Sequence, residues 1–350
     1  MKVFIKTYGC KSNISDSEAM AGLLKKQGHD IVNSEVEADY IVVNSCSVKN
    51  ATQGKELHYI REIVKEKKVI VGGCLTKTID IRKFVPEVES VFDTNSITKL
   101  PNILENPHDE FSEEKESMRL NLPIIRSKED IGIVPIGQGC LNNCTFCATK
   151  LARGHLISYR IGDIKRAVEQ CVKDGCKIIR LTSQDTGCYG LDINTTLPEL
   201  LNELVEIEGD FLIWVGMMNP WHAINILDPL IESYKTEKIK KFIHIPVQSG
   251  SDKVLIDMKR IHKVETFKEI VAKFREAHPD IHIATDIIVG YPTEEESDFQ
   301  ETVKIVQEIK PEVINVSKFS SRKGTEAAKL KPLTTEEVKR RSKIISDLII

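Results

Sequence analysis

The segment Gly139-Cys140-Leu141-Asn142-Asn143-Cys144-Thr145-Phe146-Cys147 places three cysteines at C-x3-C-x2-C spacing. It directly follows a strand that we predict at Ile131–Ile136, and further strand-then-helix units come after it. Strands that alternate with helices in this way predict an open or partial (β/α)6 barrel. A loop that follows a barrel strand lies on the face where such barrels carry their active sites. The three cysteines therefore mark a candidate site.

The remaining elements of this predicted barrel are read from apolar periodicity. Its other strands are predicted at Lys177–Leu181, Phe211–Val215, Lys241–Ile245, Ile281–Ile288 and Val313–Val316. Its helices are predicted at Asp163–Lys173, Leu197–Leu204, Ile224–Ser233, Val264–Ala277 and Glu294–Glu308, with a last helix at Thr334–Ile350.

The first hundred residues show a similar alternation. Strands are predicted at Lys2–Tyr8, Tyr40–Asn44 and Val69–Gly73. Helices are predicted at Ser15–Gln27, where Ser15 or Asp16 can cap the start, and at Ala51–Glu66. Short apolar strands separated by helices indicate a parallel, doubly wound sheet.

The fold class is thus α/β, with a doubly wound N-terminal domain over residues 1–105 and a barrel domain over residues 129–350. The acidic, proline-containing stretch 106–128, with Glu113, Glu114 and Glu116, is interpreted as a linker or hairpin between them. A solvated surface excursion of one domain is the alternative interpretation.

Composition is typical of a soluble globular protein, with 41% hydrophobic and 29% charged residues. We expect a cytoplasmic protein without a membrane span, because no long apolar run and no signal-peptide pattern are present. The net charge of −3 gives no global nucleic-acid signal, so an RNA partner would need local basic patches. Candidate patches, each with a solvated helix face as the alternative, are Lys235, Lys238, Lys240 and Lys241, then Lys318, Arg322, Lys323, Lys329 and Lys331, and finally Lys339, Arg340, Arg341 and Lys343.

The cysteine triplet has the number of ligands expected of a catalytic metal site. The chain holds nine cysteines, an odd count that favours metal binding or catalysis over a disulfide framework. Structural zinc and iron–sulfur sites usually take four protein ligands, whereas three thiolates leave one metal position open for a substrate or cofactor. The alternatives are a zinc site with a remote fourth ligand and chance clustering.

Three lone cysteines form a second candidate site. Cys10, Cys46 and Cys74 each follow a predicted strand of the N-terminal sheet. The carboxyl ends of parallel strands meet at one edge of a sheet, so these side chains should converge. Buried cysteines acting as small hydrophobic residues are the alternative.

The triplet, with Phe146 before its last cysteine, resembles the cluster motif of the radical S-adenosylmethionine (SAM) superfamily. That resemblance implies a [4Fe–4S] cluster on Cys140, Cys144 and Cys147, whose open iron binds SAM and cleaves it to a 5′-deoxyadenosyl radical. The barrel is accordingly expected to be a partial radical SAM barrel.

Taken together, the two trios resemble the methylthiotransferase family over nearly the whole chain. The resemblance implies a second [4Fe–4S] cluster on Cys10, Cys46 and Cys74. Members of the family usually also have a small C-terminal RNA-binding TRAM domain, which we do not expect in this sequence. Matching stretches are Thr7–Cys10, Asn44–Cys46, Gly73-Cys74, Ala152–Gly154, His244–Ser251 and Thr285–Glu294.

The stretches Leu181–Gly190 and Gly216–Pro220 look like the archaeal and eukaryotic threonylcarbamoyladenosine branch of that family. This implies methylthiolation of that transfer RNA (tRNA) nucleoside, 3′ of the anticodon, with an unidentified electron donor and sulfur source. Alternatives are the same chemistry on isopentenyladenosine or on a ribosomal protein. An alternative of another class is a non-catalytic iron–sulfur cluster carrier.

Several polar residues at or after the predicted strand ends are candidates for binding SAM or substrate, with a structural hydrogen-bonding role as the alternative for each. They are Gln184, Asp185, Asn219, His244, Gln248, Ser251 and Asp286. Arg153 could contact a carboxylate or phosphate, or lie exposed on the surface. We interpret Cys171 and Cys176 as structural, and Cys188 as a residue that could lie near the site.

Overall fold

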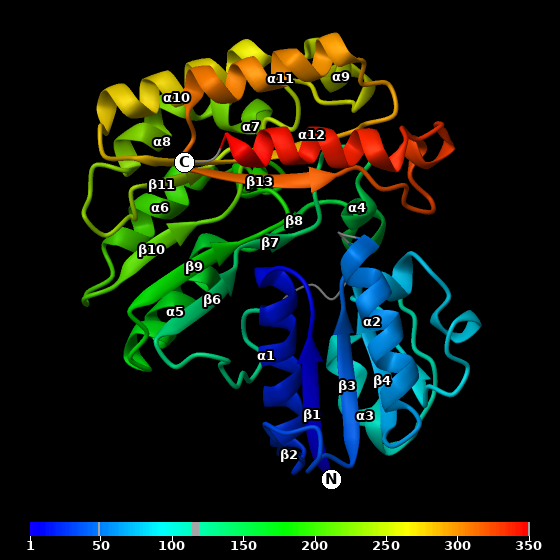
Figure 1. Ribbon diagram of the computed structural model, residues 1–350. Helices are drawn as coiled ribbons and strands as arrows, with labels where there is room; N and C mark the ends of the chain where they lie inside the picture. The colour runs from blue at the N-terminus through cyan, green and yellow to red at the C-terminus, as the bar shows by residue number, and fades with distance from the viewer. Residues whose placement is uncertain (48–49, 114–118, 349–350) are drawn as a thin grey trace.

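The computed structural model describes residues 1–47, 50–113 and 119–348 of the chain. Figure 1 shows an N-terminal sheet flanked by helices and, beyond it, a curved set of strands backed by helices. Both parts of the predicted α/β fold are therefore confirmed. Within the described residues, no helix is both long and apolar enough to cross a membrane.

The N-terminal sheet is parallel throughout, with the strand order β2-β1-β3-β4-β5. Its central strand is buried on both faces, which explains the unbroken apolar run Ile41-Val42-Val43. The strands are β1 (Lys2–Thr7), β2 (Asp30–Ile31), β3 (Tyr40–Ser45), β4 (Lys68–Gly73) and β5 (Ser90–Val91).

Helices cover both faces of this sheet, as expected for a doubly wound fold. Helices α1 (Lys11–Lys26) and α3 (Leu100–Glu105) pack on one face, and α2 (Asn50–Ile63) packs on the other (Figure 1). The cap predicted at Ser15 or Asp16 is wrong, because α1 begins at Lys11 with Cys10 at its N-cap. Asp16 forms ion pairs with two arginines instead of capping a helix.

The barrel consists of two parallel three-stranded sheets, in the orders β10-β9-β6 and β11-β12-β13. A parallel bridge between Ile213 and Ile239 connects them, so the six strands follow one another in sequence order. All six match their predicted positions closely: β6 (Ile131–Pro135), β9 (Ile178–Thr182), β10 (Leu212–Val215), β11 (Phe242–His244), β12 (His282–Val289) and β13 (Val313–Lys318).

The outer helices follow the prediction with one exception. The single helix expected at Ile224–Ser233 is wrong, since the chain forms α7 (Pro220–Asn225) and α8 (Leu227–Ser233). Pro229 lacks an N–H and is tolerated only in a first helical turn, so a new helix begins just before it. The confirmed helices are α5 (Ile161–Lys173), α6 (Leu197–Val205), α10 (Val264–Ala277), α11 (Glu296–Ile309) and α12 (Thr335–Asp347).

Short elements frame the cysteine triplet. An antiparallel pair, β7 (Gly137–Gln138) and β8 (Ile157–Ser158), precedes and follows it, and α4 (Ala148–Arg153) begins immediately after Cys147. These elements, like α9 (Asp252–Asp257), are too short to produce a readable period in the sequence.

The stretch 106–128 binds to α1 along its described part. The backbone N–H of Ile125 donates to the carbonyl oxygen of Glu18 at 3.0 Å, and Ser127 donates to the Glu18 carboxylate. Glu114 and Glu116 lie outside the described residues, as does the Ile349-Ile350 end of the last predicted helix. The stretch therefore holds α1 beside the barrel strand β6 (Figure 1).

Candidate functional site

The three N-terminal cysteines meet at the carboxyl edge of their sheet. Cys10 follows β1, Cys46 follows β3 and Cys74 follows β4, and all three line one cavity of about 750 Å³. The thiols of Cys10 and Cys74 lie 3.8 and 3.7 Å from the same amide oxygen of Asn13. This cavity, called the cysteine-lined cavity below, gives three thiols a common open space, which fits an iron–sulfur cluster with three protein ligands.

A buried arginine from the barrel reaches this trio. Arg153, at the end of α4, donates through Nε to the Cys74 thiol at 3.3 Å and through its terminal nitrogen to the carboxylate of Asp16 at 2.6 Å. Burial raises the pKa of the Cys74 thiol, and the Arg153 charge opposes that rise. Arg153 is therefore no exposed surface arginine, and its charge favours a thiolate at Cys74.

A second arginine, Arg322, lies near Cys46. The Cys46 backbone N–H donates to the buried carboxylate of Glu56 at 3.1 Å, and burial raises the pKa of Glu56 to about 8. The charge of Arg322 lies near both Cys46 and Glu56, and its side chain donates to Gln53 at 2.8 Å. Arg322 and also Arg341 are buried, so these two residues do not belong to the exposed basic patches expected from the sequence.

The triplet occupies the loop between β7 and α4. The Cys147 backbone N–H donates to the Cys144 carbonyl at 3.1 Å, which folds the loop back on itself. Asn142 Nδ2 donates to the Cys140 thiol at 3.2 Å, and Arg260 donates to the Cys144 thiol at 3.5 Å. Donors already aimed at these sulfurs would stabilise thiolates bound to a metal.

Asp185 and Cys188 lie directly behind the triplet. The Asp185 carboxylate accepts hydrogen bonds from Asn142 Nδ2 and from the backbone N–H groups of Gly187 and Asn219, at 2.9 to 3.0 Å. A hydrogen bond from Cys188 lowers the pKa of Cys140. Through Asn142, Asp185 therefore helps to hold the triplet loop in its conformation.

The other tentative binding residues divide between two cavities. Gln184, His244 and Asp286 line the cysteine-lined cavity. Gln248 and Asp286 line a smaller space of about 180 Å³ beside Phe146 and Cys147, called the Cys147 cavity below. Within the described residues, neither cavity is lined by Asp185, Asn219 or Ser251.

Hydrogen bonds fix several of these side chains. His244 Nε2 and Asn315 Nδ2 each lie 2.8 Å from Asp286 Oδ1, whereas Ser251 donates to Asp298 at 2.7 Å at the start of α9. Gln248 has a left-handed backbone (φ 74°), and its buried Oε1 accepts no hydrogen bond within the described residues. Such an orphaned acceptor fits a bound ligand that brings a donor.

Sequence reasoning missed most of the cavity wall. Lys11, Arg180, Trp214 and Phe242 all line the cysteine-lined cavity. The period-2 alternation within the barrel strands could have assigned Arg180 and Trp214 to one face, but it could not say that this face borders the N-terminal domain.

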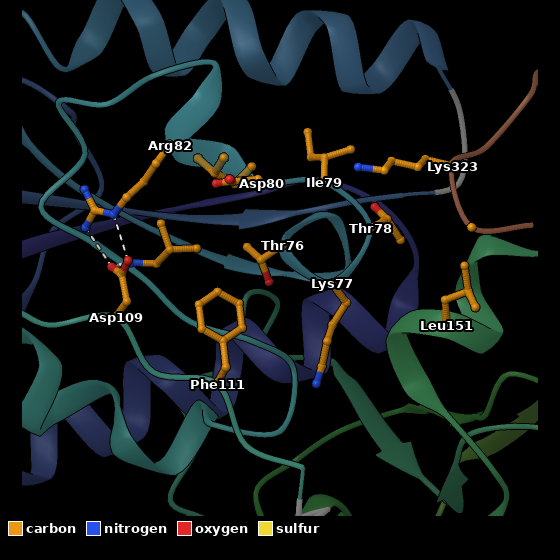
Figure 2. Close-up of a pocket in the computed structure, with 13 residues that line it drawn as sticks. Thr76, Lys77, Thr78, Ile79, Asp80, Arg82, Asp109, Phe111, Leu151 and Lys323 are labelled. Carbon is orange, nitrogen blue, oxygen red and sulfur yellow. Dashed lines mark hydrogen bonds and ion pairs between the residues drawn. The ribbon is translucent and has the colours of Figure 1, made fainter.

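A further hollow of about 690 Å³ is lined mainly by residues of the N-terminal domain, with Leu151, Lys323 and Gly324 from the barrel domain, and by none of the cysteines. Figure 2 shows Arg82 paired with Asp109 at one end and Leu151 with Lys323 at the other. Its arginine is already neutralised by a protein carboxylate, so we assign the candidate site to the cysteine-bearing edge instead.

Comparisons with known proteins agree with the two-part fold. Residues 2–93 match the model described as "Uncharacterized protein family UPF0004", and residues 134–306 match the radical SAM superfamily. The structure of a radical SAM methyltransferase, TsrM from Kitasatospora setae, aligns with a TM-score of 0.68 at 13% identity, over 93% of this chain and 74% of that one. The fold and the triplet thus define a radical SAM enzyme, a class that binds a [4Fe–4S] cluster and SAM.

Two relatives identify the family within this class. The chain is 43% identical to a probable threonylcarbamoyladenosine tRNA methylthiotransferase of Pyrococcus horikoshii, over 99% of this chain and 83% of the relative. It is 39% identical to the threonylcarbamoyladenosine tRNA methylthiotransferase of Homo sapiens, over 99% of this chain and 62% of the relative. The chain belongs to the threonylcarbamoyladenosine tRNA methylthiotransferase family.

Proposed function

We propose that this protein methylthiolates N6-threonylcarbamoyladenosine next to the anticodon of tRNA, using SAM and two [4Fe–4S] clusters. Residues 129–350 form the radical SAM domain, with its cluster on Cys140, Cys144 and Cys147. Residues 1–105 carry the second cluster on Cys10, Cys46 and Cys74, and residues 106–128 link the two domains.

The cysteine-lined cavity is the observation that carries this proposal. One space of about 750 Å³ is bordered by all three N-terminal cysteines and by His244 and Asp286 from the barrel strands. Its size is that of a small-molecule site. A group bound there is within reach of both domains at once, which supports a reaction that joins a sulfur source to a radical centre.

The bound groups would supply the radical and the sulfur, and the chain's own residues hold and orient them. Asn142 and Arg260 donate to thiols of the triplet and so favour their thiolate form. In the Cys147 cavity, the unpartnered Oε1 of Gln248 is placed to accept a hydrogen bond from SAM. His244 holds Asp286 at the border of both cavities.

The substrate must leave its base stack to enter this space. An adenosine buried in a stack cannot reach a cavity inside a barrel, and flipping costs least in a single-stranded loop. A nucleoside beside the anticodon satisfies that condition. Exposed lysines such as Lys235 and Lys240 are available for backbone contacts, which makes binding salt-sensitive.

The decisive experiment reconstitutes the protein anaerobically and incubates it with SAM, a reductant and tRNA that carries threonylcarbamoyladenosine. We expect the methylthio nucleoside by mass spectrometry and 5′-deoxyadenosine as by-product. Product on isopentenyladenosine tRNA or on a ribosomal protein alone would contradict the substrate assignment. Absence of any 5′-deoxyadenosine would instead support a cluster carrier.

Two variants separate the two proposed clusters. Cys144→Ala should lose about half of the iron and all SAM cleavage, because one of the two [4Fe–4S] clusters lacks a ligand. Cys46→Ala should lose a similar amount of iron but keep SAM cleavage, and it should give no methylthio product. Unchanged iron in Cys144→Ala, or normal product from Cys46→Ala, would contradict the ligand assignment.

A further inference from the structure

Two cations that line the cysteine-lined cavity form no ion pair within the described residues. Lys11, the first residue of α1, and Arg180, in the middle of β9, both line this cavity. Within the described residues, neither side chain donates a hydrogen bond to a protein group, and the buried Nε of Arg180 is an orphaned donor. Lys11 lies near the charges of both Arg180 and Glu18.

The acidic groups near this cavity are already engaged. Arg153 has its own counter-ion in Asp16, and Asp286 accepts from His244 and Asn315. The Glu18 carboxylate, whose charge acts on Lys11, accepts from Ser127. Arg180 therefore brings a positive charge that no ion pair of the described residues neutralises. A bound group with negative charge would do so.

Arg180 is held in a geometry that suits a planar anion. Its guanidinium lies 4.3 Å from the ring centroid of Trp214, its register partner on β10, and Trp214 contacts Phe242 edge-on at 5.1 Å. Stacking fixes the plane of the guanidinium, and the N–H groups along its edge have no partner in the part of the chain that the structure describes. That edge matches the two oxygens of a carboxylate.

We propose that Arg180 binds the carboxylate of the threonylcarbamoyl group on the target adenosine, with Lys11 as a supporting cation. This inference rests on the proposed function and names the residues that select its substrate. An unmodified adenosine or an isopentenyladenosine has no charge at that place, so it leaves Arg180 and Lys11 unpaired. We assign to Arg180 the threonylcarbamoyl substituent of the base and not an RNA phosphate. Arg180 lies within a barrel strand, where it can contact a group inside the cavity, whereas the phosphates of the RNA stay outside.

The test measures equilibrium binding of the anaerobically reconstituted protein to one tRNA with and without the threonylcarbamoyl group. Wild-type protein should prefer the modified tRNA by at least about tenfold, as expected for a charged hydrogen-bonded pair. Arg180→Gln should bring the two affinities to within about twofold. Arg180→Lys should keep part of the preference, because lysine retains the positive charge but cannot bind a carboxylate through two parallel N–H groups.

The matched control is Arg166→Gln, which removes an exposed arginine from the outer helix α5 and should leave the preference unchanged. Iron content and melting temperature establish that each variant is folded. Equal weakening of both tRNAs in Arg180→Gln would point to a phosphate contact and overturn the inference, as would an unchanged preference. If wild-type protein fails to methylthiolate the modified tRNA, the proposed function is contradicted. If it forms the product but Arg180→Gln keeps the wild-type binding preference, only this inference is overturned.

Discussion

The space around the N-terminal cysteines depends on a missing side chain at Gly9. This residue turns the chain from β1 toward α1 with φ 103°, a conformation that glycine adopts without strain. A Cβ added here would lie 2.9 Å from both Cβ and Sγ of Cys46, closer than real Cβ atoms come. Gly9 therefore does two things at once: it permits the turn and leaves room for the thiol.

We expect Gly9→Ala to displace Cys46 and so to lose about half of the bound iron, since only one of the two [4Fe–4S] clusters is affected. SAM cleavage should persist, and the methylthio product should disappear. Gly28→Ala is the matched control, because Gly28 also has a positive φ (86°) but nothing within 4 Å of an added Cβ. Iron analysis of both variants checks this, and equal iron loss in the two would attribute the effect to backbone strain instead.

At the scale of elements, the turn between α9 and α10 carries a histidine that the fold keeps neutral. His262 is 3% exposed, and burial together with the nearby charge of Arg260 lowers its pKa from 6.5 to about 3. Between these two values the unfolded chain binds a proton that the folded chain does not. Stability should therefore fall as the pH drops below about 6.5.

We expect His262→Gln to lose this part of the acid sensitivity. Between pH 7 and pH 5 the free energy of unfolding of the wild type should fall by about 2 kcal/mol more than that of the variant. Urea unfolding at both pH values measures the difference. The exposed His58 is the control, since His58→Gln should keep the wild-type dependence. Parallel pH curves for wild type and His262→Gln would contradict the assignment.

Across the whole molecule, one buried carboxylate links three segments that are distant in sequence. Asp16 on α1 accepts from Arg119 at 2.5 Å and from Arg153 on α4 at 2.6 Å, and all three side chains are almost fully buried. Arg119 also donates to the carbonyl of Thr94. The N-terminal sheet, the stretch 106–128 and the barrel are thus held together by one charge network.

Asp16→Asn should lower the free energy of unfolding by about 3–5 kcal/mol, because two buried arginines lose their counter-ion. The exposed pair Lys25–Asp30 gives the contrast, and Asp30→Asn should leave stability unchanged within error. Denaturant unfolding of both variants measures this. A stability loss in Asp16→Asn no larger than that of Asp30→Asn would mean that the network does not hold the domains together.

The sequence by itself determined the six barrel strands, the doubly wound sheet and the contiguous triplet, because these depend on local apolar patterns and short spacing. It also predicted that Cys10, Cys46 and Cys74 would converge, since parallel strands end at one edge. Only the tertiary structure decided that Arg153 and Arg322 approach this edge from the barrel and that Arg180 and Lys11 share its cavity. It likewise placed Cys188 behind Cys140. Those contacts join residues from separate elements, and no local pattern encodes which faces of two domains will pack together.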